Sequence, residues 1–494
     1  KMLQVYGFGS GEIDQLGLGE DVLELKKGTK IFPNENFLNI KVVNLVCGAM
    51  HTLVLSSMGE IYSWGCNDDF ALGREGDDNI PEKINLNIPV NNISAGDSHS
   101  VAYNTELNRV FLWGSYRNTD GKFGEPKKLP VELDNKKWKG NVKKVVCGAN
   151  HTMVLANKKV YLWGNSEFGQ IGRMPLARHK AEASFKIESF SLNQVDDIFT
   201  ATNHSFLLYT GKNGTTLRTW GLNNYGQLGH SETNNQWFPQ TVEFFSNKNV
   251  KYATGGDFHS TVLLDNGEVY AWGKNDENQL GLEDSSLVLQ EPTKIDFFTQ
   301  EMRIESVLSS ANFCYAMNYT KQKVYSWGFG ENHVLGNFKE DCNEEVPYEI
   351  DTMKLFRNNQ VKKISLGNQH VMAIIKNSGK KAETASAENG EAIETEGKEN
   401  KVAEEDEDLF KFEFNLEPFR NAKQRRAKKR KNSDSEKIEI KKIEEESIVS
   451  EVSEIPKKVE VRKESKVSKI SKMSKISKIS KIEEVAEALE VEGA

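Results

Sequence analysis

The chain has 494 residues, 28% of them charged, with 38 glycines and 11 prolines, so it is long enough for a large core beside a segment that lacks one. Its formal net charge of −8 excludes a general nucleic-acid-binding protein as judged by total charge. Five cysteines without a Cys-x-x-Cys pair argue against a disulfide framework and favour a reducing compartment. No stretch approaches the roughly 18 consecutive apolar residues of a membrane span, and residues 1–7 lack a signal-peptide core, so we expect no membrane partner.

A repeat of about 50 residues runs through the first three quarters of the chain. One signal is a glycine that ends a strand-like run, often as Trp-Gly: Gly9, Gly65, Gly114, Gly164, Gly221, Gly273 and Gly328. The other is Gly-x-x-His or a close relative, at residues 48–51, 96–99, 148–151, 202–204, 256–259, 310–313 and 367–370. Between the signals lie alternating runs typical of short strands. This pattern predicts an all-β fold, a propeller with one blade for each copy.

The two ends of the repeat region complement each other. Residues 1–19 supply the strand with its glycine but lack the preceding Gly-x-x-His part. Residues 361–376 supply that part and one more strand, and then the repeat stops. Pairing of the two segments would cover edge strands that otherwise stay open. We therefore predict a closed seven-bladed propeller over residues 1–376.

The composition changes from residue 377 to residue 494, where Lys- and Glu-rich runs alternate and Trp and Tyr are missing. Such a polyampholyte buries too little apolar area to fold, so we predict a disordered tail. A basic cluster at 423–431 favours a nuclear-import signal or a contact with DNA over a merely solvated charge run. Its charged residues are Lys423, Arg425, Arg426, Lys428, Lys429, Arg430 and Lys431.

One repeat breaks the rule of the others. In six copies the strand-ending glycine is followed eight positions later by the glycine of an x-Leu/Ile-Gly signal, as in Gly65 and Gly73. In the third copy the distance from Gly114 to Gly124 is ten, which we interpret as a polar turn lengthened within residues 117–120. Repeat packing does not explain a lengthened turn in one copy of seven. It is therefore the first candidate for a functional element.

Six of the nine histidines are repeat histidines: His51, His99, His151, His204, His259 and His370. Blade symmetry would hold them apart, so we expect structural hydrogen bonds within each blade, with His259 as an exception, and no metal site. Neither a catalytic motif nor a nucleotide-binding fingerprint occurs, and we expect no cofactor. The residues just before these histidines vary between repeats, and symmetry places them on one face, where variation is typical of partner recognition.

Together, residues 9–20, 65–74, 94–99 and 111–115 resemble the regulator of chromosome condensation family, over about residues 1–376. The lengthened turn and Gly169-Gln170-Ile171-Gly172-Arg173-Met174-Pro175 are the specific part of this resemblance. Members of the family are seven-bladed guanine-nucleotide exchange factors for the small GTPase Ran. The resemblance implies exchange without bond-making chemistry, and therefore a protein that is not an enzyme.

The resemblance also implies site residues. The lengthened turn would be the family's β-wedge, which enters the GTPase near its phosphate-binding site. Its residues here are Tyr116, Arg117, Asn118, Thr119, Asp120, Gly121, Lys122, Phe123 and Gly124. The GTPase-binding positions of the family correspond to Glu12, Asp97, Asn150, Arg173 and His259. Asn150 and Glu12 depart from the family pattern, which has an acidic residue at the first position and Asp at the second.

Chromatin binding is a further implication of the resemblance. Arg178, His179 and Lys180 lie in the longest interval between repeats and resemble the family's histone-contacting loop. In the family, an arm before the propeller carries the import signal and the DNA contact, and here the basic cluster of the tail would take that role, binding an import receptor and DNA. We therefore predict a nuclear, chromatin-associated exchange factor. A propeller scaffold or chromatin adaptor without exchange activity is the alternative, and a hydrolase working in the propeller channel is a more distant one.

Overall fold

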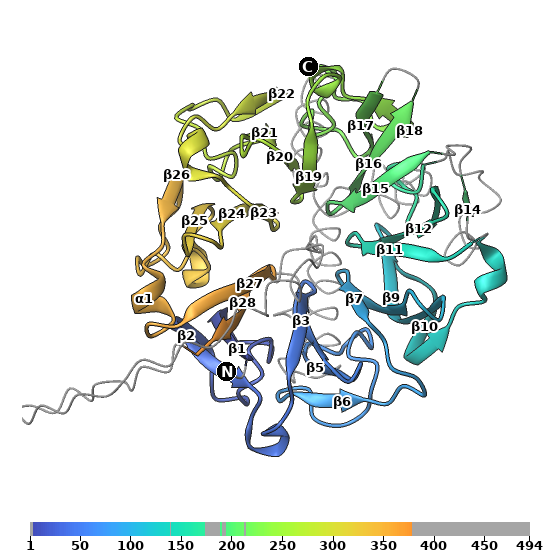
Figure 1. Ribbon diagram of the computed structural model, residues 1–494, viewed down its shortest axis with the longest axis vertical. Helices are drawn as coiled ribbons and strands as arrows, with labels where there is room; N and C mark the ends of the chain where they lie inside the picture. Colours follow the sequence, from blue (N-terminus) through green and yellow to red (C-terminus); the bar gives the residue numbers. More distant parts are fainter. Residues whose placement is uncertain (1–2, 139, 173–187, 190–193, 212–213, 378–494) are drawn as a thin grey trace, which may run out of the picture. The chain divides into compact units, whose positions relative to one another are not determined.

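The computed structural model describes residues 3–138, 140–172, 188–189, 194–211 and 214–377. Over these residues the strands form seven four-stranded sheets that stand as blades around a ring (Figure 1). The predicted seven-bladed propeller is thus confirmed. Residues 378–494, with the predicted tail and its basic cluster at 423–431, lie outside the described residues.

We number the blades 1 to 7 in chain order. Blades 1 and 2 consist of β3 (Val42–Cys47), β4 (His51–Ser56), β5 (Ile61–Gly65) and β6 (Glu82–Ile84), and of β7 (Asn92–Ala95), β8 (His99–Asn104), β9 (Arg109–Asn118) and β10 (Gly121–Glu132). Blades 3 and 4 consist of β11 (Val142–Cys147), β12 (His151–Ala156), β13 (Lys159–Gly164) and β14 (Glu188–Ser189), and of β15 (Val195–Thr200), β16 (His204–Gly211), β17 (Gly214–Gly221) and β18 (Gln236–Thr241). Blades 5 and 6 consist of β19 (Val250–Gly255), β20 (His259–Leu264), β21 (Val269–Lys274) and β22 (Val288–Lys294), and of β23 (Ser306–Ser309), β24 (Phe313–Asn318), β25 (Lys323–Gly328) and β26 (Glu344–Glu349). Blade 7 joins β27 (Gln360–Leu366) and β28 (His370–Lys376) to β1 (Leu3–Ser10) and β2 (Glu24–Phe32).

In blades 1 to 6 the first strand in the chain lies nearest the centre of the ring and the last lies at the rim, whereas in blade 7 the innermost strand is β27 and the outermost is β2 (Figure 1). Short helical turns lie between blades or in their loops: η1 (Glu35–Phe37), η2 (Asn135–Lys137), η4 (Glu243–Phe245), η5 (Gln300–Met302), η6 (Glu331–His333) and α1 (Thr352–Leu355). Within the described residues, no helix is long and apolar enough to cross a membrane.

Blade 7 closes the ring with both ends of the repeat region, as predicted. Strand β1 pairs antiparallel with β28 over seven residue pairs, from Leu3 with Lys376 to Gly9 with His370. Strand β2 then pairs with β1 at the rim, and β27 pairs with β28 at the centre. No long edge of β1 or β28 is left open, because each has a partner on both sides.

The Trp-Gly and Leu-Gly signals of neighbouring blades fit together. The six tryptophans that precede strand-ending glycines are at most 1% exposed. Trp64 of blade 1 packs on Gly17 of blade 7, where a Cβ atom would lie 2.5 Å from the indole Cδ1. Gly17 also has a φ of +66°, a conformation that favours glycine. Both the backbone conformation and the close approach of the Trp64 ring therefore require glycine at this position. The indole Nε1 of Trp64 donates to the carbonyl of Gln15 at 3.1 Å, and the equivalent bond occurs in blades 2, 4, 5 and 6.

The repeat histidines also link blades, which corrects the prediction that they bond within each blade. The Nε2 atom of His51 bonds Ser100 of the next blade at 2.8 Å, and His99 bonds Thr152 at 2.9 Å. His151, His204, His259 and His370 make the equivalent contact, each with the residue after the next repeat histidine position. Each histidine and its partner lie at the start of the second strand of adjacent blades. The repeat spacing is the same whether a histidine bonds its own blade or the next one, so the spacing does not distinguish the two arrangements.

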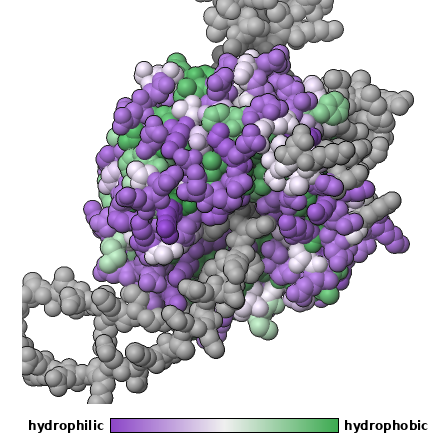
Figure 2. All heavy atoms as spheres, turned by 45° about the horizontal axis from the view of Figure 1, so that its top comes forward, coloured by the Kyte–Doolittle hydropathy of each residue, from purple (hydrophilic) through white to green (hydrophobic). Residues whose placement is uncertain are grey.

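This contact accounts for the glycine of the Gly-x-x-His signal. A Cβ atom at Gly48, Gly148 or Gly367 would lie 2.0–2.1 Å from Cε1 of the histidine three residues later. Phe313 stands at the histidine position of blade 6, so that one boundary has an apolar side chain instead. Between the blades the core consists of apolar side chains, while the face shown in Figure 2 is covered mainly by hydrophilic residues with hydrophobic ones scattered among them.

Candidate functional site

One hydrogen bond, repeated in every blade, brings the variable residues to a single face of the ring. The residue after each strand-ending glycine donates its backbone N–H to the carbonyl of the residue before the repeat histidine position. In blade 2 this bond joins Ser115 to Ser98 at 2.8 Å, and in blade 3 it joins Asn165 to Asn150 at 2.6 Å. The Gly-x-x-His loops and the turns after Trp-Gly therefore share one face, as predicted. We call it the wedge face.

On the wedge face, blade 2 extends into a β-hairpin in place of a compact turn. Strand β9 runs past Gly114 to Asn118 and pairs with the start of β10, through Asn118 with Gly121, Arg117 with Lys122 and Tyr116 with Phe123. Thr119 and Asp120 form the two-residue turn, within the segment where the insertion is predicted. The register then shifts between Phe123 and Lys127, where Gly124 has a φ of +71°. The hairpin joins the blade through this irregularity.

Tyr116 anchors the base of the hairpin and is itself buried, at 1% exposure. Its hydroxyl accepts from Nε1 of Trp163 at 2.6 Å and bonds the hydroxyl of Thr152 at 3.0 Å. In blades 1, 2, 4, 5 and 6 the indole at this position donates to a carbonyl in the Leu-Gly turn of the preceding blade, and blade 2 lacks such a turn for Trp163. The Tyr116 hydroxyl replaces that carbonyl. Burial raises the pKa of Tyr116 well above its ordinary value, so the phenol stays protonated.

Blade 1 holds the hairpin from one side. The carboxylate of Asp69, which is 2% exposed, accepts from both Nε and Nη2 of Arg117, with Nε at 2.7 Å. The backbone carbonyl of Asp69 accepts from the hydroxyl of Ser115 at 3.1 Å. A guanidinium that donates twice to one buried carboxylate fixes both distance and direction. The Arg117 side chain is therefore tied to the neighbouring blade.

Blade 3 holds the hairpin from the other side. Asn150 accepts from the backbone N–H of Arg117 at 2.7 Å, and Asn165 donates to its carbonyl at 3.1 Å. Glu167 accepts from both the backbone N–H and the hydroxyl of Thr119, at 2.9 and 2.6 Å. The backbone of the hairpin is thus bonded directly by side chains of the next blade, up to its turn.

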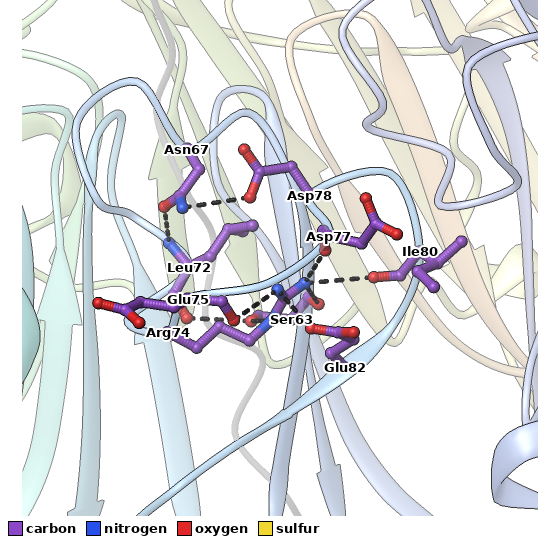
Figure 3. Close-up of polar contacts among 9 residues, drawn as sticks. All are labelled: Ser63, Asn67, Leu72, Arg74, Glu75, Asp77, Asp78, Ile80 and Glu82. Carbon is purple, nitrogen blue, oxygen red and sulfur yellow. Dashed lines mark hydrogen bonds and ion pairs between the residues drawn. The ribbon is translucent and has the colours of Figure 1, made fainter.

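The equivalent turn of blade 1 closes on its own blade (Figure 3). The Arg74 guanidinium donates to the hydroxyl and carbonyl of Ser63, to the carbonyls of Asp77 and Ile80, and to Glu82 at 2.9 Å. Asn67 accepts from the N–H of Leu72 and donates to Asp78. In blade 4, His230 stands at the position of Arg74 and bonds Thr219, the counterpart of Ser63. The turns of blades 1 and 4 are therefore bonded to their own sheets, whereas the hairpin of blade 2 extends beyond its sheet.

The predicted GTPase-binding residues are placed as follows. Glu12 is exposed in the turn of blade 7, while Asp97 and Asn150 are buried in the loops of blades 2 and 3. Asn150 is bonded to the hairpin, through the backbone N–H of Arg117. His259 is fully buried and bonds Sγ of Cys314 at 3.2 Å, so it behaves as the other repeat histidines do. Burial lowers its pKa to about 3, which leaves it neutral at physiological pH. The partly exposed residues of that loop are Asp257 and Phe258.

The prediction that His259 differs from the other repeat histidines by contacting a partner directly is thus corrected, because its ring lies between two blades. Arg173 and the predicted histone loop with Arg178, His179 and Lys180 lie outside the described residues. Sequence reasoning did not find Asp69, Asn165 and Glu167. Their signal would have been acidic or amide residues in the turns of the two blades that flank the lengthened one. In the part of the chain that the structure describes, no three His, Cys, Asp or Glu side chains lie close enough to hold a metal ion.

Comparisons with known proteins agree with this architecture. Residues 4–373 match the family model described as the RCC1-like domain. The chain is 33% identical to the regulator of chromosome condensation of Mus musculus, over 75% of this chain and 90% of that protein. It is 27% identical to the guanine nucleotide exchange factor SRM1 of Saccharomyces cerevisiae, over 49% of this chain and 53% of that protein. Among solved structures, Prp20p of Saccharomyces cerevisiae, described with its binding to Gsp1p and histones, superposes with a TM-score of 0.69 and 26% identity, over 76% of this chain and 92% of that one.

Proposed function

The chain belongs to the family of the RCC1-like domain, and on this basis we propose that it is a guanine-nucleotide exchange factor for the small GTPase Ran. The wedge, residues 116–124, enters the GTPase near its phosphate-binding site and promotes release of GDP. The observation that carries the proposal is the hairpin, which occurs in one blade and is held by side chains of both neighbours. A scaffold that only packs repeats has no need of such an element.

Exchange by this route makes and breaks no covalent bond. A GTPase holds its nucleotide and Mg²⁺ with a phosphate-binding loop and a helix N-terminus. A protein that binds the nucleotide-free conformation more tightly than the loaded one lowers nucleotide affinity by the same factor. The chain therefore needs a rigid element that competes for the phosphate-binding site, and it needs no catalytic acid or base.

The remaining contacts with the GTPase are assigned to the wedge face. Glu12 and Arg173 are proposed to meet the GTPase directly, while Asp97, Asn150 and His259, which are buried, are proposed to hold the loops that form this face. Arg173 stands at the repeat position of Arg74, whose guanidinium bonds the hydroxyl of Ser63. The counterpart of Ser63 in blade 3 is Leu162, which has no hydroxyl. This difference in sequence between the two blades supports a role of Arg173 toward a partner.

We further propose that the protein is nuclear and acts on chromatin. The Prp20p structure is described with histone binding, which supports histones as partners of this chain through the loop with Arg178, His179 and Lys180. The basic cluster at 423–431 would bind an import receptor and DNA, because its density of positive charge suits both an acidic groove and a phosphate backbone.

The test is release of a fluorescent GDP analogue from Ran by catalytic amounts of the chain. The informative variant deletes Thr119 and Asp120. This deletion joins Asn118 to Gly121, and Asn-Gly is a favoured two-residue hairpin turn, so the shortened hairpin can close again. We expect rapid release with the native chain and slow release with the shortened one. If neither accelerates release while both remain folded, the exchange function is wrong and an adaptor role takes its place.

A further inference from the structure

We propose that Asp69 and Glu167, one on each blade beside the wedge, are positioning residues for nucleotide exchange. They hold the hairpin in the orientation in which it enters the GTPase, without being part of the hairpin. This inference rests on the proposed exchange function and extends it, because it assigns part of the activity to residues in two other repeats.

The need for support follows from the hairpin itself. Beyond Gly114 it has only two strands, and Thr119 and Asp120 at its tip are exposed. An isolated two-stranded hairpin is marginally stable in water. If the wedge were free to bend, much of its binding free energy would be lost in ordering it on contact with the GTPase. Supporting bonds from outside the hairpin remove that loss.

Asp69 supports the hairpin at its middle. Its side chain is 2% exposed, whereas that of Arg117 is 22% exposed, so the pair lies at the edge of the protein interior. A displaced wedge would take the guanidinium away and leave a buried carboxylate without its cation. Such a loss is strongly unfavourable, because removing one partner of a buried pair leaves an uncompensated charge. Asp69 therefore resists movement of the hairpin away from blade 1.

Glu167 supports the hairpin at its turn. One carboxylate oxygen accepts from the N–H of Thr119 at 2.9 Å and from Nδ2 of Asn165 at 3.2 Å. The other accepts from the Thr119 hydroxyl at 2.6 Å. The backbone N–H of Glu167 in turn donates to Asn165 at 2.8 Å, which fixes the loop that carries the carboxylate. Asp69 and Glu167 thus act from opposite sides on residues two positions apart.

The chain provides a matched control. Asp276 stands three residues after the strand-ending glycine of blade 5, as Glu167 does in blade 3. Its carboxylate pairs with Lys274 of its own turn at 2.5 Å and accepts from Gln279 of the same turn. The same residue position therefore serves its own blade in one case and a neighbouring hairpin in the other.

The experiment uses the full chain and the variants Asp69→Ala, Glu167→Ala and Asp276→Ala. Two quantities are measured: amide hydrogen exchange of residues 115–124 in the free protein, and kcat and KM for release of the GDP analogue from Ran. We expect Asp69→Ala and Glu167→Ala to deprotect the amides of Arg117 and Thr119. We also expect them to lower kcat by roughly 10- to 100-fold, the effect of misplacing a critical group by about 1 Å, while KM changes little. Asp276→Ala should change neither the protection nor kcat.

Glu167→Gln serves as a milder variant in case an alanine variant unfolds. It keeps one oxygen to accept from the Thr119 N–H, so its kcat should lie between those of the native chain and Glu167→Ala. A lower protection with unchanged kcat would overturn the inference, as would a raised KM with unchanged kcat, which indicates a direct contact. Failure of the native chain to release nucleotide would instead overturn the exchange function, whereas the hydrogen-exchange result would still show whether the two carboxylates hold the hairpin.

Discussion

Blades 1 and 2 start alike, at Trp64-Gly65 and Trp113-Gly114, and then diverge. In blade 1 the chain folds back on its own sheet, with the Arg74 guanidinium bonded to its carbonyls (Figure 3). In blade 2 the strand continues into a hairpin that lies between Asp69 of blade 1 and Glu167 of blade 3. A repeat can thus close its turn with one well-placed side chain of its own. The hairpin, which projects from its sheet, is instead bonded by side chains of the two blades beside it.

The largest expected effect concerns a feature that blades 1 and 2 share with the other blades, the buried histidines between blades. Acidic pH should lower the stability of the protein through them. Burial lowers the pKa of His151, His259 and His370 to about 3. The pKa of a histidine in the unfolded chain lies near 6.5, so below that pH the unfolded state binds more protons than the folded one. The free energy of unfolding therefore decreases as the pH is lowered. The loss is about 2 kcal/mol for each such histidine at pH 5. Urea unfolding at pH 7.5 and pH 5 measures it, and His151→Gln should reduce the difference. Equal stability at the two pH values would contradict the prediction.

Arg74→Ala removes the bonds that hold residues 74–82 on the sheet of blade 1 and leaves the bonds between Asp69 and Arg117 in place. The variant removes a buried guanidinium from several carbonyls and from Glu82, so the free energy of unfolding should fall by about 3 kcal/mol. Exchange by the remaining folded protein should stay normal, because the hydrogen bonds of the Arg74 guanidinium go to residues 63–82 of blade 1. Urea unfolding and GDP release measure the two effects. A loss of exchange without a loss of stability would show that the two turns are not independent.

Tyr116→Phe separates the packing role of the wedge from its role in exchange. The hydroxyl is the acceptor for Trp163 and a partner of Thr152, so its removal should lower the free energy of unfolding by about 1–2 kcal/mol. The ring remains and keeps its contact with His99, whose centroid lies 4.3 Å away. GDP release should therefore change little. Trp113→Phe is the comparison, since it removes the indole donor from the carbonyl of Ala71 in blade 1, which still accepts from the hydroxyl of Ser100.

Lys128→Met should have the smallest effect. Its ammonium lies 5.2 Å from the ring of Phe70 and thus joins the outer strand of blade 2 to the turn of blade 1. Lys128 is exposed, and a contact of this kind at an exposed site contributes about 0.5–1 kcal/mol. We expect a change of that size in urea unfolding and a normal exchange rate. A marked loss of exchange would mean that this contact, and not the polar bonds, holds the hairpin to blade 1.

The sequence predicts the seven blades, the closure by residues 1–19 and 361–376, and the position of the hairpin, because all three depend on spacing along one chain. It does not reveal Asp69 and Glu167, since each meets the hairpin across a blade boundary, 48 residues away. The direction of the histidine bonds and the burial of His259 are missed for the same reason. Contacts between blades join residues about one repeat apart, and a single sequence shows the period without showing which side chains meet.

The pairing of β1 with β28 has a consequence for synthesis of the protein. Leu3 and its partner Lys376 are 373 positions apart in the chain. At about 5–20 residues per second, roughly 20–75 s pass between the emergence of the two from a ribosome. During that interval β1 lacks its inner neighbour, and blades 1 to 6 can form before blade 7 does. The newly made chain therefore exposes one strand edge until translation reaches β28, and this period is the one in which another chain could pair with it.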